Sequence, residues 1–277
     1  VNELEVAVDG NGLILSILKG EALRLCRVLF YESQISSFKT RACELGFTSK
    51  KTNFRDGIKL SGKVDRIDVW QDYFKIVDYK TGNVSVASED VYYGKKIQLI
   101  SYLNAFSGFE NKKPAGVLYF PIKNKFADGE DKVSDLYKNS GIILNDASVC
   151  MALDNTLSPD NPKSHIIKAE LKNNAQTRES GELVLKQNDN LVSDEVISGL
   201  MKYVYELSNK AIGEILDGFA MPSPLDFGGG KLPCDYCPLK NCCGVKLTEF
   251  SSGRKKLSKI SYEKIAQVDY ENNKLDN

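Results

Sequence analysis

Apolar residues near the beginning of the chain recur at spacings of three and four. They are Leu13, Ile14, Ile17, Leu18, Leu25, Val28 and Leu29. This spacing places them on one face of an amphipathic helix, which we expect from Leu13 to about Tyr31. A second helical pattern covers residues 194–216, where Val196, Ile197, Leu200, Val204, Leu207, Ala211 and Ile215 share one face. Gly218 and the prolines that follow it predict the end of this helix.

Two alternating segments predict a β-hairpin. The segments GIKLSGKVDRIDVW, residues 57–70, and YFKIVDYKTG, residues 73–82, are separated by Gln71 and Asp72. In the first segment Ile58, Leu60 and Val64 fall on one side, and in the second Phe74, Ile76 and Asp78 do so. We therefore expect two strands joined by a tight turn.

After the hairpin, the pattern predicts a crossover to another strand. Ile97, Ile100, Leu103 and Ala105 fit a helix from Tyr92 to about Phe106, and AGVLYFPI, residues 115–122, is typical of a buried strand. Strand, helix and strand in this order indicate an α/β fold with a mixed sheet flanked by helices. Residues 125–193 are more polar and less periodic, so we expect them to form an elaboration beside the core.

The composition allows one folded domain over residues 1–250. Its core would cover about 38–125, followed by the elaboration, the helix at 194–217, a cysteine cluster at 234–243 and a polar tail at 251–277. Hydrophobic residues make up 42% of the 277 positions, which is enough to fill a core. Basic and acidic residues number 37 each, so any nucleic-acid contact must be local. No apolar run suits a membrane span and no leader is apparent, so we expect a cytoplasmic protein without a membrane partner.

The predicted hairpin carries two carboxylates and a cation in a pattern that suits phosphodiester cleavage. Asp78 and Lys80 leave the same face of their strand, and Asp65 lies on the paired strand. Carboxylates of this kind chelate a hard cation such as Mg²⁺ or Mn²⁺, and Lys80 would orient the water or stabilise the developing charge. An Asp-x-Lys pair at a strand end is often only a solvated edge. Here the apolar residues before Asp78 argue that its carboxylate is partly buried and needs a cation.

Other polar residues near the hairpin have structural interpretations. Asp68 faces opposite to Asp65, and we expect it to pair with Arg66 or another surface cation. His165 is interpreted as a surface or satisfied residue in the elaboration. Cys26 and Cys43 are interpreted as core residues.

Four of the seven cysteines crowd into ten residues near the end of the chain. Cys234, Cys237 and Cys243 offer three thiolates at loop spacing, which fits three corners of a site for zinc or a [4Fe–4S] cluster. Spacing alone does not separate these two ligands. Cys242 breaks the five-residue spacing to Cys237.

The run GKVDRIDVWQDYFKIVDYKTG closely resembles the nuclease core of RecB-type PD-(D/E)XK enzymes, a restriction-endonuclease-like fold. Downstream, YYGKKIQLISYL resembles the next motif of that family, a helix that bears Gln98 and Tyr102. The resemblance implies a metal-dependent deoxyribonuclease in which Asp65, Asp78 and the Tyr79 carbonyl hold the metal and Lys80 acts in catalysis. Gln98 and Tyr102 would hold Lys80 or a DNA phosphate.

The cysteine segment CDYCPLKNCC is similar to that of AddB-type subunits of helicase–nucleases, as are AGVLYFPIKN, LYKNSGIILND and EILDGFAMPSPL. This likeness implies a [4Fe–4S] cluster on Cys234, Cys237 and Cys243, completed by a cysteine far upstream. It also implies single-stranded DNA ends as substrate, an AddA-type partner, and a role in double-strand-break repair and recombination. The family's upstream histidine and cysteine have no counterpart here. Because the chain begins at Val1, we expect it to be a fragment that lacks them.

Two other functions are compatible with the same residues. One is a catalytically incomplete module that binds DNA and a partner protein, which the absent histidine favours. The other is a stand-alone exonuclease of the CRISPR-adaptation type, although the long elaboration argues against so compact a protein.

Overall fold

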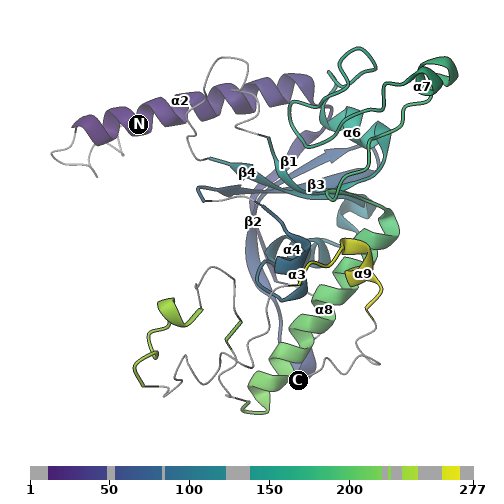
Figure 1. The fold of residues 1–277 in the computed structure, drawn as a ribbon. Coiled ribbons are helices and arrows are strands. Elements are labelled where there is room, and N and C mark those ends of the chain that lie inside the picture. The colour runs from purple at the N-terminus through teal and green to yellow at the C-terminus, as the bar shows by residue number, and fades with distance from the viewer. Residues whose placement is uncertain are drawn as a thin grey trace. The chain divides into compact units, whose positions relative to one another are not determined.

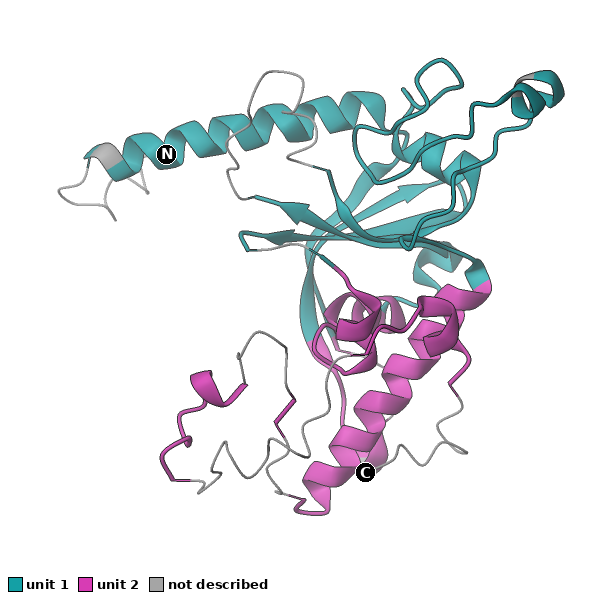
Figure 2. Ribbon diagram, in the orientation of Figure 1, with its two compact units in different colours: residues 1–47, 62–85, 106–194 teal, residues 48–61, 86–105, 195–277 magenta. Residues whose placement is uncertain are grey.

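The computed structural model describes residues 12–48, 54–82, 85–122, 138–219, 224–225, 233–242 and 258–268. The chain divides into two compact units, each made of three segments (Figure 2). The first unit comprises residues 1–47, 62–85 and 106–194, and the second comprises residues 48–61, 86–105 and 195–277. None of the helices in the described ranges combines the length and hydrophobicity that crossing a lipid bilayer requires.

A six-stranded mixed sheet forms the centre of the first unit (Figure 1). Its strands are β1 (Lys39–Thr48), β2 (Ser61–Trp70), β3 (Tyr73–Lys80), β4 (Lys113–Pro121), β5 (Ser140–Leu144) and β6 (Leu191–Val192), and they lie side by side in this order. Strands β2 and β3 are antiparallel, β3 and β4 parallel, β4 and β5 antiparallel, and β5 and β6 parallel. The expected α/β fold with a mixed sheet and flanking helices is confirmed.

The β2–β3 hairpin follows the alternation in the sequence, with one correction. Trp70 pairs with Tyr73 across the Gln71-Asp72 turn, as predicted. The first strand, however, begins at Ser61, because residues 55–57 form a 3₁₀ turn, η1 (Arg55–Gly57), that ends on Gly57 with a φ of 71°. Ile58 and Leu60 therefore lie outside the strand in which they were expected.

The connection from β3 to β4 contains two short helices instead of the single predicted one. These are α3 (Ser88–Tyr92) and α4 (Gln98–Ala105), and η2 (Phe109–Asn111) follows them. Gly94, between the two helices, has a φ of 75°, a left-handed conformation that interrupts a helix. The parallel pairing of β3 with β4 confirms the predicted crossover.

The segment expected as an elaboration contributes to the sheet itself. Strand β5 is buried along its whole length and β6 pairs with it, so the sheet extends well beyond residue 125. Helices α6 (Ala147–Leu153) and α7 (Ala175–Ser180) also belong to this segment. The carboxylate of Asp154 organises the loop after α6 by accepting hydrogen bonds from Thr156, Ser164 and the backbone of His165. His165 is half-buried, as a satisfied residue would be.

The first helix, α2 (Gly12–Ile35), is longer than predicted and less buried. Ile14, Ile17 and Leu18 are 45%, 55% and 46% exposed, so the apolar stripe of its N-terminal half is not covered within the described residues. The interpretation of Cys26 and Cys43 as core residues is wrong, since both are exposed. Cys26 lies on α2, and Cys43 lies on β1, which is an edge strand.

In the second unit, α8 (Asp194–Leu216) has the bounds that the sequence predicted. Its buried residues are Ile197, Leu200, Tyr203 and Val204. The C-terminal segment contributes a short helix, α9 (Tyr262–Ala266), whose Tyr262 and Ile265 are buried. The region expected to be only a polar tail thus packs part of itself against the unit, because it places these two apolar side chains one turn apart.

Candidate active site

The β2–β3 hairpin brings the two predicted carboxylates together on one face of the sheet. The register that pairs Arg66 with Val77 continues to place Asp65 opposite Asp78. One carboxylate oxygen of Asp65 accepts a hydrogen bond of 2.8 Å from the backbone N–H of Tyr79. Asp65 is thereby tied to the strand that carries Asp78.

Asp78 is buried at the end of an apolar strand, as the sequence predicted. It is 3% exposed, and its Oδ2 atom lies 2.7 Å from the ammonium of Lys80. Lys80 is thus the cation that faces this buried oxygen. Burial raises the pKa of Asp78, Lys80 opposes this effect, and Asp65 adds to it. A buried carboxylate that lies beside a second carboxylate is a strong acceptor for a further cation.

Lys80 lies where the buried strand reaches solvent. Its side chain is 37% exposed, and its ammonium lies 5.6 Å from the centre of the Tyr119 ring. Tyr119 stands opposite Asp78 in the parallel register of β3 and β4. The aromatic ring, which the sequence analysis did not identify, is placed to hold the lysine beside the carboxylates.

Gln98 and Tyr102 belong to the second unit, where α4 places them one turn apart. The amide nitrogen of Gln98 donates a hydrogen bond of 2.9 Å to the phenol oxygen of Tyr102. Gln98 is exposed and Tyr102 is buried. Their predicted shared face is confirmed, and their action on Lys80 or on a phosphate stays a prediction.

Two of the three predicted cluster cysteines lie in the described part of the chain. Cys234 is on the 3₁₀ turn η4 (Pro233–Tyr236), and the backbone N–H of Cys237 donates to its carbonyl at 3.2 Å. Both are half-buried, whereas Cys242 is exposed. Cys243 lies outside the described residues, so the thiolate set of Cys234, Cys237 and Cys243 stays a prediction.

The other face of the hairpin carries a network of charged side chains that is larger and more buried than the sequence predicted. Asp68 pairs with Arg66, as expected, but the pair is buried and not at the surface, and it includes a second buried cation, Lys75. Burial favours the neutral acid, yet Lys75 and Arg66 hold the pKa of Asp68 below its ordinary range. Burial lowers the pKa of Lys75. A lysine between Phe74 and Ile76 in an apolar strand was the available signal for this cluster.

The oxygen donors of Asp65 and Asp78 fit a hard divalent cation, and the burial of Asp78 beside a second carboxylate supports this fit. Within the described residues, no group of three or more His, Cys, Asp or Glu side chains is placed to bind a metal. The Tyr79 carbonyl is the predicted backbone ligand.

Comparison with known proteins agrees with this geometry. The chain is 28% identical over 248 residues to the B subunit of the ATP-dependent helicase/deoxyribonuclease of Listeria welshimeri, and the match covers 80% of this chain and 21% of that protein. The corresponding protein of Clostridium acetobutylicum is 29% identical over 253 residues, which cover 82% of this chain and 21% of the relative. The chain therefore spans about a fifth of the length of these relatives. A family model for the PD-(D/E)XK nuclease superfamily matches residues 5–244, and the chain belongs to this superfamily.

Proposed function

We propose that this chain is the metal-dependent deoxyribonuclease domain of an AddB-type helicase–nuclease subunit. The observation that carries the proposal is the Asp65, Asp78 and Lys80 arrangement, in which a buried carboxylate lies beside a second carboxylate and a half-exposed lysine. The substrate would be single-stranded DNA ends released by unwinding during double-strand-break repair and recombination. The partner would be an AddA-type helicase–nuclease subunit.

The residues divide the chemistry among themselves. Asp65, Asp78 and the Tyr79 carbonyl would hold Mg²⁺ or Mn²⁺, which supplies Lewis acidity and an activated water when bound. The Tyr79 N–H fixes one oxygen of Asp65 and leaves the other available as a ligand. The ammonium of Lys80 would stabilise the negative charge that develops on the phosphate during bond cleavage.

A basic hollow in the first unit offers a local place for the DNA backbone. It has a volume of about 460 Å³ and is lined by Lys138, Lys163, Lys168 and Lys186. Among its described lining residues only Glu170 is acidic, and it pairs with Lys186 at 2.5 Å. Such a lysine-rich surface suits phosphate oxygens, and it supplies the local positive charge that a chain of zero net charge needs.

We further propose that Cys234, Cys237 and Cys243 supply three thiolates to a [4Fe–4S] cluster. The spacing of the cysteines and the half-buried positions of Cys234 and Cys237 support this assignment. The exposed Cys242 is the least suitable of the four neighbouring thiols.

The proposal is tested by a cleavage assay on two single-stranded DNA substrates. One is linear and labelled at its end, and the other is a covalently closed circle. We expect Mg²⁺-dependent shortening of the linear substrate only, inhibition by EDTA, and no cleavage by an Asp78→Asn variant. Cleavage of the circle would indicate an endonuclease, and metal-independent cleavage would contradict the proposal.

A second candidate is a DNA-binding and partner-binding module without catalytic activity. The absence of a third His, Cys, Asp or Glu ligand near the carboxylates, within the described ranges, favours it. It predicts DNA binding that is unchanged by Mg²⁺ and by Asp78→Asn, with no cleavage under any condition.

A further inference from the structure

Tyr79 contributes to both faces of the hairpin. On one face its backbone N–H donates to Asp65 at 2.8 Å. On the other face its phenol oxygen accepts a hydrogen bond of 2.9 Å from Arg66, whose guanidinium also lies 5.8 Å from the centre of the tyrosine ring. Arg66 directly follows Asp65 in β2. Tyr79 on β3 and the adjacent residues Asp65 and Arg66 on β2 therefore connect the carboxylate face to the network on the other face.

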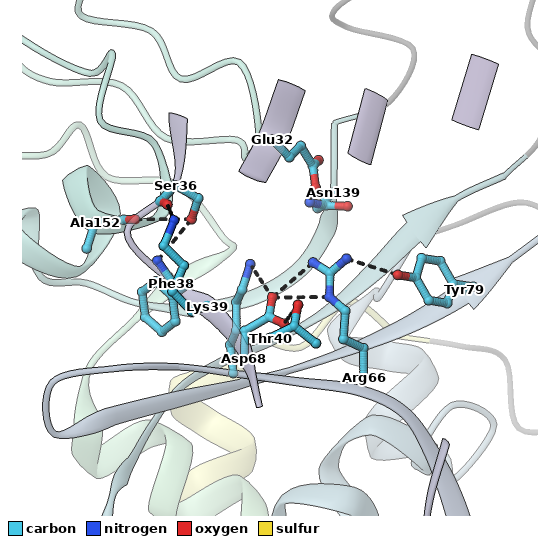
Figure 3. Close-up of polar contacts among 11 residues, drawn as sticks. Glu32, Ser36, Phe38, Lys39, Thr40, Arg66, Asp68, Tyr79, Asn139 and Ala152 are labelled. Atoms are coloured by element: carbon cyan, nitrogen blue, oxygen red, sulfur yellow. Dashed lines mark hydrogen bonds and ion pairs between the residues drawn. The ribbon is translucent and has the colours of Figure 1, made fainter. Parts of the chain in front are cut away.

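Arg66 belongs to a largely buried network, and its hydrogen bonds to Asp68 are short (Figure 3). Arg66 donates two hydrogen bonds to one oxygen of Asp68, at 3.1 and 2.9 Å. The other Asp68 oxygen accepts from the hydroxyl of Thr40 at 2.9 Å, and the ammonium of Lys75 lies 3.3 Å from the first. The side chains of Arg66, Asp68 and Lys75 are 12%, 4% and 4% exposed, so water screens these contacts little.

A cavity of about 300 Å³ lies beside this network. Its lining includes Arg66, Asp68, Lys75 and Tyr79, and Glu32 on α2. The Tyr79 ring is held by the hydrogen bond from Arg66 and by an edge contact with Phe120, at 5.4 Å between ring centres.

We propose that the buried Arg66, Asp68 and Lys75 network is a positioning device for the metal site on the opposite face. It holds the side chain of Tyr79 and thereby fixes the backbone whose N–H orients Asp65 and whose carbonyl is the expected metal ligand. Arg66 and Tyr79 are positioning residues, since neither side chain lies on the carboxylate face. This inference rests on the proposed function, because it requires a metal bound by Asp65 and Asp78.

The test is Mn²⁺ binding to the 277-residue chain without DNA, measured by electron paramagnetic resonance. Tyr79→Phe removes the oxygen that Arg66 contacts and keeps the ring. We expect Mn²⁺ affinity to fall about tenfold, which is typical of an outer-shell partner of a metal ligand. Arg66→Lys is a second variant that keeps a buried cation but cannot bridge Asp68 and Tyr79, and we expect a similar loss.

Tyr262→Phe is the matched control. Tyr262 is also buried, and its hydroxyl donates a hydrogen bond of 2.9 Å to the Val86 carbonyl, within the second unit. This variant should lose a comparable amount of thermal stability and keep the parent's Mn²⁺ affinity.

The outcomes separate this inference from the proposed function. If both Tyr79→Phe and Arg66→Lys lower thermal stability but bind Mn²⁺ like the parent, the network is only structural and the inference is wrong. In that case Asp78→Asn would still abolish Mn²⁺ binding and the proposed function would stand. If Asp78→Asn binds Mn²⁺ like the parent, the metal site itself is refuted, and the inference falls with it.

Discussion

Asp68 and Asp78 offer a matched pair for comparing a carboxylate that stabilises the fold with one that is expected to bind a metal. Both are aspartates on neighbouring strands, and each is 3% exposed. Asp68 faces two buried cations, whereas Asp78 faces one half-exposed lysine and a second carboxylate. The same change, Asp to Asn, should therefore cause a large loss of stability at Asp68 and little change in stability at Asp78.

For Asp68→Asn, the structure predicts a large loss of stability. The change removes the carboxylate that pairs with the largely buried Arg66 and the buried Lys75, whose other acidic neighbour is Glu32, and breaking a buried ion pair in this way costs about 3–5 kcal/mol. For a chain of this size the loss corresponds to a decrease in Tm on the order of 10 °C. Because the pKa of Asp68 is lowered by folding, its contribution is present at neutral pH and is lost as the pH falls through the folded-state value.

For Asp78→Asn, the structure predicts little change in stability without metal. Folding raises the pKa of Asp78, so the ionised carboxylate destabilises the fold at neutral pH and a neutral amide removes that cost. The variant also loses the ion pair with the half-exposed Lys80, which contributes at most about 1 kcal/mol. The two effects oppose each other, and we expect a net change within about 1 kcal/mol. Cleavage, in contrast, should fall by more than about 100-fold.

The assay is thermal unfolding in EDTA at several pH values, combined with Mg²⁺-dependent cleavage of single-stranded DNA. The difference in stability between the parent and Asp68→Asn should narrow as the pH falls below the ordinary carboxyl range. A large loss of stability in Asp78→Asn would refute the argument that its carboxylate is held for a cation. Equal stabilities of Asp68→Asn and the parent would refute the buried network.

We expect three further outcomes, which concern the carboxylate site, the lysine-lined hollow and the cysteine segment. Lys80→Ala should lower the cleavage rate by about 100-fold and leave Mn²⁺ affinity nearly unchanged, and a pure loss of Mn²⁺ binding would contradict a transition-state role. Lys168→Glu should weaken the binding of single-stranded DNA and reduce the salt dependence of the affinity by the equivalent of about one phosphate contact. Fluorescence anisotropy measures both quantities, and Lys172→Glu is the control. In a protein that holds the cluster, Cys243→Ser should abolish the visible absorption band and Cys242→Ser should not, whereas the reverse would identify Cys242 as the ligand.

The hairpin and the long helix α8 were predictable because their patterns are local. Alternation gave the Gln71-Asp72 turn and the common face of Asp78 and Lys80, and helical spacing gave both ends of α8. Burial of Asp78 followed from its place after an apolar run. In each case the residues that decide the structure lie within a few positions of one another.

Two of the missed features depend on pairing between distant segments, and a third depends on a local backbone conformation. Strand β5 lies in a polar region of the sequence, and its place in the sheet depends on pairing with β4 and β6, which are distant from it in the sequence. The helix around Gly94 was interrupted by a backbone conformation that apolar spacing does not encode. The exposure of Cys43 follows from the edge position of β1, and an edge strand is defined only by which strands pair.

Strand parity explains how one short motif serves two purposes. In VDRID, the odd-numbered Asp65 and Ile67 lie on the face of the candidate active site, and the even-numbered Arg66 and Asp68 lie on the face of the buried network. Because successive side chains of a strand alternate between its two faces, Asp65 and Asp68, which are three positions apart, lie on opposite faces. A one-residue insertion in β2 would exchange the two sets, placing Arg66 among the carboxylates and Asp65 in the buried network. The register of this hairpin is therefore a requirement of the proposed chemistry as well as of the fold.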